Sequence, residues 1–354
     1  MLYHRRSHPY NRNGTKRTSN QTNVVANLTD KQSSVKTKEP RPNVATIRPR
    51  AKTNTNPSSN GQNVHKIGEY FILDSNPGST FSRAIDCQNR AELTCKIIES
   101  KKLGDVLAPY TRLESHENIN EIVDVIVGET KAYLFMQNSH GDLHSYVKTK
   151  KRLREEEAVK LFRQIVKAVC RCHEAGIVLR DLKLRKFVFK DKDRTELKLE
   201  CLEDACVLEG SDDTLEDKHG CPAYVSPELL HSSGGYSGKI ADIWSLGVML
   251  YTMLVGRYPF QDVEPTVMFS KIRRGLFVVP DSLSSKAKCL IKSMMRQEPS
   301  QRLTAEELLE HPWFKSTTQP INLYRCDRRS PDQTVPSVNV DESYFVPVKS
   351  RAVV

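Results

Sequence analysis

A short loop carries the residues of this chain that are best suited to chemistry. Residues 180–183 read Arg-Asp-Leu-Lys, so that Asp181 stands two positions before Lys183. An aspartate in such a loop can accept the proton of an attacking hydroxyl, and a nearby lysine can stabilise the charge of a phosphoryl group in transfer. The loop therefore indicates phosphoryl transfer, with Asp181 as the base and Lys183 as the charge-stabilising group.

The metal ligands that this chemistry needs are altered. The loop resembles the H-R-D-L-x-x-x-N catalytic loop of protein kinases, whose Asn binds Mg²⁺, but Lys186 stands at the Asn position. The chain has no D-F-G triplet, and Cys201 aligns with the Asp of that triplet. An ammonium repels Mg²⁺, and a thiol is a poor ligand for an ion that prefers oxygen. Glu203 or Asp204 could replace the lost ligand if the register shifts.

The nucleotide-binding residues are also incomplete. Lys96 matches the strand lysine that holds the ATP phosphates in kinases. The segment 74–81, where a glycine-rich loop is expected, contains one Gly, and Pro77 removes an N–H that could face a phosphate. We therefore expect either no cofactor or weak ATP binding without Mg²⁺. Three acids are candidates for the regulatory ion pair with Lys96: Glu99, Asp105 and Glu114.

Other kinase landmarks follow in the expected order and predict a structural role for four residues. Residues 220–228, Gly-Cys-Pro-Ala-Tyr-Val-Ser-Pro-Glu, match the end of a kinase activation segment, and Asp-Ile-Trp-Ser-Leu-Gly from Asp242 matches the start of its buried central helix. We expect Glu228 and Arg302 to form a buried ion pair that ties this segment to the last helices. The residues predicted to maintain the fold are Arg180, Glu228, Asp242 and Arg302.

Three stretches make the resemblance more specific. Residues 182–187 (Leu-Lys-Leu-Arg-Lys-Phe), 217–224 and 246–260 closely resemble the Tribbles pseudokinases. The resemblance implies an α+β, bilobal, protein-kinase-like fold, with a small β-rich N-lobe, a larger helical C-lobe and disordered tails. It also implies that Asp181 and Lys183 are vestigial. Two interpretations of Asp181 remain open: a residual catalytic base, or a residue that hydrogen-bonds the loop.

A peptide in the C-terminal tail indicates a binding function. Pro336 restricts Val335 to extended conformations, which lowers the entropy cost of docking. Tribbles proteins use a similar peptide to recruit the constitutively-photomorphogenic RING ubiquitin ligase, although Ser337 replaces the acid that often follows the proline there. The predicted ligase-docking residues are Asp332, Gln333, Val335 and Pro336.

A second segment, residues 308–314, permits two interpretations. It resembles the Tribbles segment linked to MAP kinase kinases, but a His-Pro-Trp-Phe ending is also ordinary in the last helix of kinases, where the aromatic rings pack inside the lobe. The candidate docking residues are Leu308, Leu309, His311, Pro312, Trp313 and Phe314.

The resemblance implies an adaptor that brings a ubiquitin ligase to its targets. It implies targets such as CCAAT/enhancer-binding transcription factors, inhibitory contact with protein kinase B and MAP kinase kinases, and localisation in the nucleus and cytoplasm. A weak, metal-independent serine/threonine kinase that uses Lys96 and Asp181 is the alternative.

The elements that must position these residues form a strand-rich half followed by a helical half. We expect a disordered basic tail over 1–66, a folded domain over 67–315 and a flexible tail over 316–354, because both tails have few large apolar residues. The patterns predict strands at 70–73, 93–98, 122–127 and 132–136, and helices at 155–172, 240–255, 284–296 and 304–311.

Charge and composition exclude several classes of protein. The net charge of +11 arises within residues 1–66, which hold 13 basic and 2 acidic residues, so the rest of the chain is neutral. Without interleaved aromatic residues this tail does not indicate nucleic-acid binding. The nine cysteines form no CxxC pair, which argues against a zinc site or a disulfide framework. No secretory signal and no apolar run of roughly 18 residues is present, which argues against a membrane protein.

Overall fold

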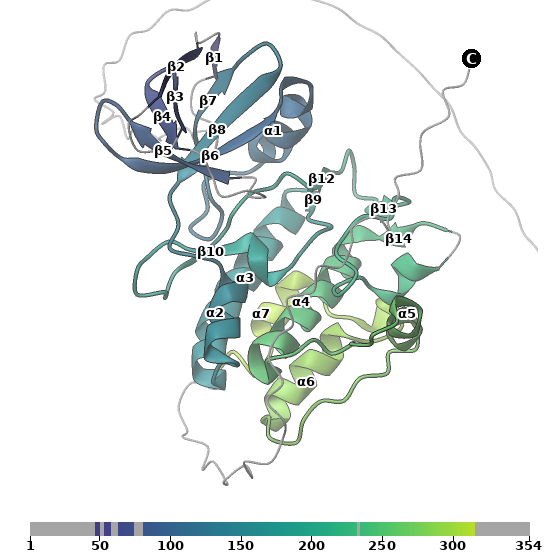
Figure 1. Ribbon diagram of the computed structural model, residues 1–354. Coiled ribbons are helices and arrows are strands. Elements are labelled where there is room, and N and C mark those ends of the chain that lie inside the picture. The colour runs from purple at the N-terminus through teal and green to yellow at the C-terminus, as the bar shows by residue number, and fades with distance from the viewer. Residues whose placement is uncertain (1–46, 50–52, 58–62, 74–80, 232–233, 316–354) are drawn as a thin grey trace, which may run out of the picture. The chain divides into compact units, whose positions relative to one another are not determined.

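The computed structural model describes residues 47–49, 53–57, 63–73, 81–231 and 234–315. A β-sheet forms the N-terminal part, and helices dominate the remainder (Figure 1). The predicted α+β kinase-like fold, with a β-rich N-lobe and a helical C-lobe, is confirmed. The disorder predicted for residues 1–66 and the flexibility predicted for residues 316–354 concern residues that lie mostly outside the described part, but residues 47–49, 53–57 and 63–66 are described and belong to strands.

The N-lobe sheet contains eight strands in the order β1-β7-β8-β6-β5-β4-β3-β2. They are β1 Ile47–Pro49, β2 Thr53–Pro57, β3 Asn63–Ile67, β4 Tyr70–Leu73, β5 Phe81–Asp86, β6 Glu92–Glu99, β7 Ile122–Val127 and β8 Lys131–Gln137. The four strands predicted from the sequence correspond to β4, β6, β7 and β8. The sheet begins earlier than predicted, because β1, β2 and most of β3 precede Ile67. Backbone pairing does not require the apolar side chains on which the prediction relied.

Seven α-helices lie in the described part of the chain. They are α1 Leu103–Arg112, α2 Leu143–Lys150, α3 Glu155–Glu174, α4 Gly238–Val255, α5 Pro265–Arg273, α6 Ser285–Met294 and α7 Ala305–Glu310. The helices α3, α4, α6 and α7 were predicted, whereas α1, α2 and α5 were not. Helix α2 begins through its cap, because the Asp142 side chain accepts a hydrogen bond from the Ser145 N–H at 2.8 Å.

Short elements frame the candidate loop between α3 and α4. Three two-stranded pairs form here, namely β10–β11, β9–β12 and β13–β14. The strands are β9 Ile177–Val178, β10 Phe187–Phe189, β11 Leu197–Leu199, β12 Cys206–Val207, β13 Thr214–Leu215 and β14 Tyr236–Ser237. The 3₁₀ turns among the described residues are η1 Ser100–Lys102, η2 Leu184–Lys186, η3 Pro227–Leu230 and η4 Pro299–Gln301.

Helix α4 lies in the core of the helical lobe. Among the described residues it is the one helix whose length and composition would allow it to cross a membrane, but 78% of it is buried inside the fold. It ends at Gly256, which has φ of 83° and whose hypothetical Cβ would collide with the Lys151 carbonyl oxygen. Burial of this kind is typical of the core helix of a globular domain.

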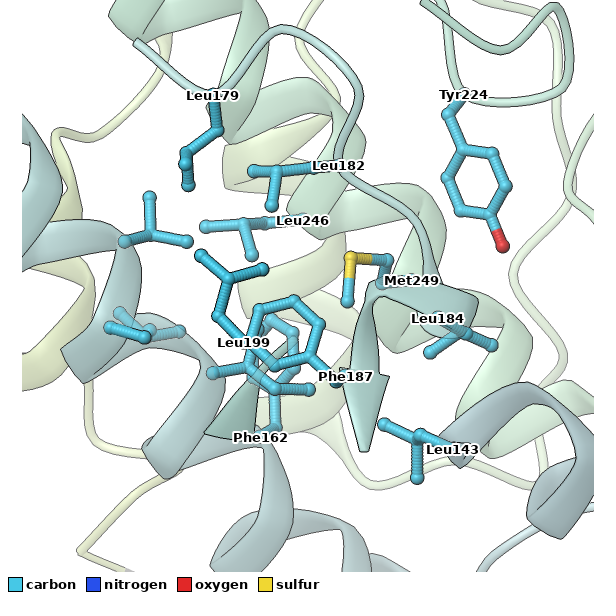
Figure 2. Packing of buried hydrophobic residues seen from close by; sticks show 14 of the residues in the cluster. Leu143, Phe162, Leu179, Leu182, Leu184, Phe187, Leu199, Tyr224, Leu246 and Met249 are labelled. Carbon is cyan, nitrogen blue, oxygen red and sulfur yellow. The ribbon is translucent and has the colours of Figure 1, made fainter. Parts of the chain in front are cut away.

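The candidate loop rests on this core through its own leucines. Figure 2 shows Leu182 and Leu184 among buried side chains that include Phe162, Leu246 and Met249. Leu182 and Leu184 are at most 1% exposed. Alternating apolar residues therefore fix the loop to α3 and α4, so that its polar side chains occupy defined positions.

Candidate functional site

One buried carboxylate holds the backbone of the loop. The Asp242 side chain, 2% exposed, accepts hydrogen bonds from the Leu179 N–H at 2.8 Å and the Arg180 N–H at 2.9 Å. His173 Nε2 lies 2.9 Å from the same carboxylate. Arg180 has φ of 59°, a conformation that is costly for a residue with a side chain, and these bonds offset that cost. Asp242 therefore shapes the loop rather than taking part in chemistry.

Two lysines approach the carboxylate of Asp181. Lys183 Nζ lies 2.7 Å from Asp181 Oδ2, and Lys186 Nζ lies 3.7 Å from the same oxygen. The residue at the metal-ligand position thus presents a cation to the candidate base. Asp181 is held by ion pairs within its own loop.

Lys186 also neutralises the acid that follows the altered metal triplet. It forms an ion pair with Asp204, whose other oxygen lies 3.4 Å from His219 Nε2. Burial alone would raise the pKa of Asp204, but the His219 hydrogen bond and the Lys186 ammonium lower it well below its usual value. Burial alone would lower the pKa of Lys186, but Cys201, Asp204 and Asp181 raise it above its usual value. Both groups are therefore fixed in their charged forms.

Lys96 of β6 is engaged by the segment that replaces the metal triplet. This lysine is 4% exposed and forms an ion pair with Glu203. Its Nζ lies 3.8 Å from Cys201 Sγ and 4.6 Å from the centroid of the Phe81 ring. The cation that would hold ATP phosphates therefore already has an anionic partner and an aromatic neighbour.

The sequence-based candidates for the partner of Lys96 were wrong. Glu99 pairs with Lys101 at 2.7 Å, Glu114 pairs with Arg171 at 3.1 Å, and Asp105 lies in the first turn of α1. The prediction assumed that a regulatory helix supplies the partner, as in active kinases. Glu203 belongs to the altered triplet, where the motif pattern indicates only a replacement metal ligand and not a partner for Lys96. Within the described residues, no cluster of three or more His, Cys, Asp or Glu side chains could hold a metal ion.

Comparison with known proteins shows which family this chain belongs to. A family model described as a protein kinase domain matches residues 82–314. Tribbles homolog 2 of Mus musculus is 57% identical over 280 residues, which are 79% of this chain and 82% of the relative. Tribbles homolog 1 of Homo sapiens is 55% identical over 276 residues, 78% of this chain and 74% of the relative. Tribbles homolog 3 of Mus musculus is 51% identical over 271 residues, 77% of each chain. The chain belongs to the Tribbles pseudokinase family.

In this Tribbles chain two of the residues predicted to maintain the fold, Arg180 and Arg302, form ion pairs with acidic residues of the activation segment. Arg180 donates from Nη1 to Asp217 Oδ2 at 2.6 Å and from Nε to the Asp204 carbonyl at 2.8 Å. Arg302 donates to the two carboxylate oxygens of Glu228 at 2.6 and 2.7 Å, and its side chain is 0% exposed. These contacts tie the loop and the end of the activation segment to the helical lobe.

Glu200, which directly precedes the altered metal triplet, is a titratable group that sequence reasoning missed. Burial raises the pKa of its carboxyl from 4.5 to about 7, against the opposing effect of the Lys96 and Lys186 charges. Nothing in the local sequence distinguishes this glutamate from exposed ones, because its burial depends on how distant parts of the chain pack around it.

We expect Glu200→Gln to flatten the dependence of stability on pH. The unfolded chain ionises this carboxyl near 4.5 whereas the folded chain keeps the proton to about 7, so stability falls as pH rises through this window. The slope that Glu200 contributes is at most about 1.4 kcal/mol per pH unit. Urea unfolding at several pH values between the two pKa values measures it, with the exposed Glu156→Gln as the matched control. A Glu200→Gln slope equal to that of the parent would contradict the assignment.

The segment 308–314 is built into the helical lobe. Trp313 and Phe314 are each 1% exposed and lie 6.2 and 6.1 Å from the Phe162 ring, centroid to centroid. Trp313 Nε1 donates to Glu155 Oε2 at 3.1 Å. Leu308 is buried, Leu309 and His311 are half-buried, and Pro312 is exposed. Docking through this segment stays a prediction, and it concerns Leu309, His311 and Pro312 more than the aromatic rings.

Trp313→Ala is expected to lower the free energy of unfolding by about 3–5 kcal/mol, because it removes a large buried ring and leaves a cavity beside Phe162. It also leaves Glu155 without the indole N–H. Chemical denaturation followed by circular dichroism measures the loss, and the exposed Glu306→Ala on the neighbouring helix serves as control. A loss below about 1 kcal/mol would show that the ring is dispensable for folding.

The ligase-docking residues Asp332, Gln333, Val335 and Pro336 lie outside the described residues. Their assignment therefore stays a prediction from sequence.

Proposed function

We propose that this Tribbles chain is an adaptor that binds target proteins through its kinase-like domain and recruits a RING ubiquitin ligase through Asp332–Pro336. The observation that best supports this proposal is the ion pair between Lys96 and Glu203. In an active kinase a glutamate of the regulatory helix pairs with this lysine, which also holds the nucleotide phosphates, and the metal triplet is left to bind Mg²⁺. Here the charge of Lys96 is balanced within the protein, as are those of Asp181 and Asp204, while the contacts that maintain the fold are kept.

In this proposal the tail and the domain act together through proximity. A ligase bound to the tail has a high effective concentration next to a target on the domain, which promotes ubiquitination and degradation. The partners proposed from the family resemblance are the constitutively-photomorphogenic type of ligase and CCAAT/enhancer-binding transcription factors. Protein kinase B and MAP kinase kinases are the proposed targets of inhibition, and the proposed locations are the nucleus and cytoplasm.

A pulldown with the full chain tests the role of the tail. Replacing Val335 and Pro336 with Ala should lower ligase binding at least about tenfold, because the extended apolar anchor is lost. Val338 and Val340 lie in the same tail, so their replacement with Ala makes a matched control that should bind as the parent does. If the two double variants bind the ligase equally well, the assignment of Asp332–Pro336 as the docking peptide is wrong.

A weak, metal-independent kinase is the second candidate. It is favoured by Lys183 Nζ, which lies 2.7 Å from Asp181 Oδ2, in the loop where a base and a phosphate-stabilising cation would act. In this case the only cofactor would be ATP without Mg²⁺. A phosphotransfer assay of the parent chain and Lys96→Met, with and without Mg²⁺, separates the two functions. Turnover by the parent that Lys96→Met abolishes would favour the enzyme. Equal signal from the parent and Lys96→Met would exclude it.

A further inference from the structure

A short, strongly basic turn joins helix α2 to helix α3 (Figure 1). Five of the seven residues from 148 to 154 are lysine or arginine, and none is acidic. Outside residues 1–66 the chain is neutral overall, so this segment is a local concentration of positive charge. We call it the basic turn, and all of its cations are exposed: Lys148, Lys150, Lys151, Arg152 and Arg154.

The backbone of the basic turn is fixed by the helical lobe. Leu153 is 4% exposed, and its N–H donates to the Met253 carbonyl at 2.8 Å. The Lys151 carbonyl oxygen lies so close to Gly256 that a Cβ there would collide with it. Lys151 itself has φ of 67°, a conformation that is costly for a residue with a side chain. The basic turn therefore holds its charges in defined positions.

The acids that follow the basic turn leave most of its charge unbalanced. Glu157 forms an ion pair with Lys150 at 2.8 Å, whereas Glu155 is held by hydrogen bonds from other parts of the lobe. Glu156 is exposed at the start of α3. Three cations of the basic turn form no ion pair with any residue that the structure describes: Lys148, Arg152 and Arg154.

Part of this charge does not support the local structure. Lys148 and Lys150 lie in the last turn of α2, where cations favour the helix dipole. Arg154, by contrast, is the N-cap of α3, where a cation is unfavourable and where its side chain makes no capping hydrogen bond. Residues that contradict a local rule are expected at functional sites. Arg154 therefore indicates a role other than stability.

A further cation approaches α2 from the candidate loop. Helix α2 packs against the turn η2, which contains the exposed Arg185. Burial lowers the pKa of His144 on α2, and the charges of Arg185 and Lys148 lower it further, against the opposing charge of Asp142. Both cations therefore lie near this imidazole, and the positive surface continues from the basic turn along α2.

The chemistry of this surface fits an acidic peptide better than a membrane or a nucleic acid. None of the exposed large apolar side chains among the described residues lies between 143 and 160, so the basic turn has no apolar group to enter a bilayer. The neighbouring Tyr146 is half-buried, with Lys150 Nζ 4.6 Å from its ring centroid, and offers no free ring for a base. Arginine guanidinium groups match the paired oxygens of carboxylates and phosphates.

We propose that the basic turn is a docking site for an acidic segment of a target protein, whose carboxylates or phosphates pair with Lys148, Arg152 and Arg154. This inference rests on the proposed adaptor function, because it states which kind of target segment the kinase-like domain binds. Charges arranged in this way speed association and select acidic partners. Recruitment of the ligase through Asp332–Pro336 does not involve this surface.

Cross-linking of the full chain to an acidic probe tests the site. The probe is an acetylated peptide of consecutive glutamates, and a carbodiimide joins its carboxylates to nearby lysine amines. Mass spectrometry should find the probe on Lys150 and Lys151 more often than on Lys131 and Lys292, which are exposed lysines elsewhere in the domain. Equal labelling of these four lysines would overturn the proposal.

Two arginine variants show whether the basic turn attracts the probe. Arg152→Gln with Arg154→Gln leaves the lysine amines in place and should lower their labelling at least about fivefold, because two cationic contacts are lost. Arg273→Gln with Arg274→Gln removes the same charge from exposed residues elsewhere and should label as the parent does. Equal labelling of the basic turn in the two variants would contradict the assignment. Both variants should still bind the ligase in the pulldown, so failure of the basic turn is distinguishable from failure of the tail.

Competing ligands identify the source of the negative charge. A phosphoserine peptide and an unlabelled glutamate peptide of equal length should both displace the probe, and the stronger competitor identifies phosphate or carboxylate as the preferred group. A glutamine peptide should not displace it. If oligouridine RNA or vesicles containing phosphatidylserine displace the probe at a lower concentration than either peptide, the partner is not an acidic peptide.

Arg154→Ser separates docking from folding. Serine is a favoured N-cap, so this variant should unfold at a higher temperature than the parent. It should also be labelled less by the probe, because one cation of the docking site is lost. A variant that unfolds at a lower temperature and is labelled as strongly as the parent would show that Arg154 serves the fold, and would overturn its role in docking.

Discussion

Arg302→Ala is expected to lower the free energy of unfolding by about 3–5 kcal/mol, because it leaves the Glu228 carboxylate buried without its cation. The Glu228 side chain is 13% exposed, so water can replace little of the lost interaction. Arg302 also donates to the carbonyls of Ile240 and Arg296 and lies 5.0 Å from the Trp244 ring centroid. In a domain of about 250 residues this loss corresponds to a melting temperature lower by roughly 6–20 °C.

Urea unfolding of four chains isolates the ion pair from the loss of packing. These are the parent, Arg302→Ala, Glu228→Ala and the double variant, with the exposed Arg274→Ala as the control for loss of a surface arginine. We expect the double variant to be less destabilised than the sum of the single variants, because removing both partners leaves no unpaired charge. Strictly additive losses would show that the pair contributes no coupling.

Glu203→Ala is expected to raise the affinity for ATP without Mg²⁺ at least about tenfold, because it releases the Lys96 ammonium for a phosphate. Two unit charges about 4 Å apart interact by roughly 4 kcal/mol at an effective dielectric constant of about 20, which bounds the gain from above. Calorimetric titration of the full chain with ATP in the presence of a chelator measures the change.

Two further variants show whether the gain arises from Lys96. Adding Lys96→Met to Glu203→Ala should abolish the gain, and the exposed Glu209→Ala, which removes a negative charge from the same segment, should leave ATP binding unchanged. If Glu203→Ala binds ATP no better than the parent, the ion pair does not limit access to this lysine.

The elements that the sequence predicted best are those with strong periodicity. Helix α3 and the hairpin of β7 and β8 follow their apolar patterns closely, because burial of one face requires that spacing. Helix α1 was missed, and it contains Pro109, a residue type that usually indicates the end of a helix. Strands β1 and β2 were missed because polar residues pair through the backbone alone, and nothing in their composition reveals the partner.

In the site, too, the sequence predicted the residues that stand at motif positions but not the contacts that form between distant parts of the chain. The replacement of a metal-binding Asn by Lys186 and of a metal-binding Asp by Cys201 can be read directly from the motifs. The new role of Lys186, which joins Asp181 to Asp204, could not be read, since it depends on how three parts of the chain pack around one side chain.

The sequence by itself determined the kinase-like fold, the altered metal ligands and the resemblance to Tribbles proteins, because each depends on residue types at fixed local spacing. Only the tertiary structure decided which charges neutralise one another. Lys96 and Glu203 are 107 positions apart, and their ion pair exists because β6 and the segment after β11 meet in the fold. The strength of an ion pair depends on the distance in space between the two charges. For residues far apart in the sequence, that distance is determined by the packing of apolar residues elsewhere in the fold.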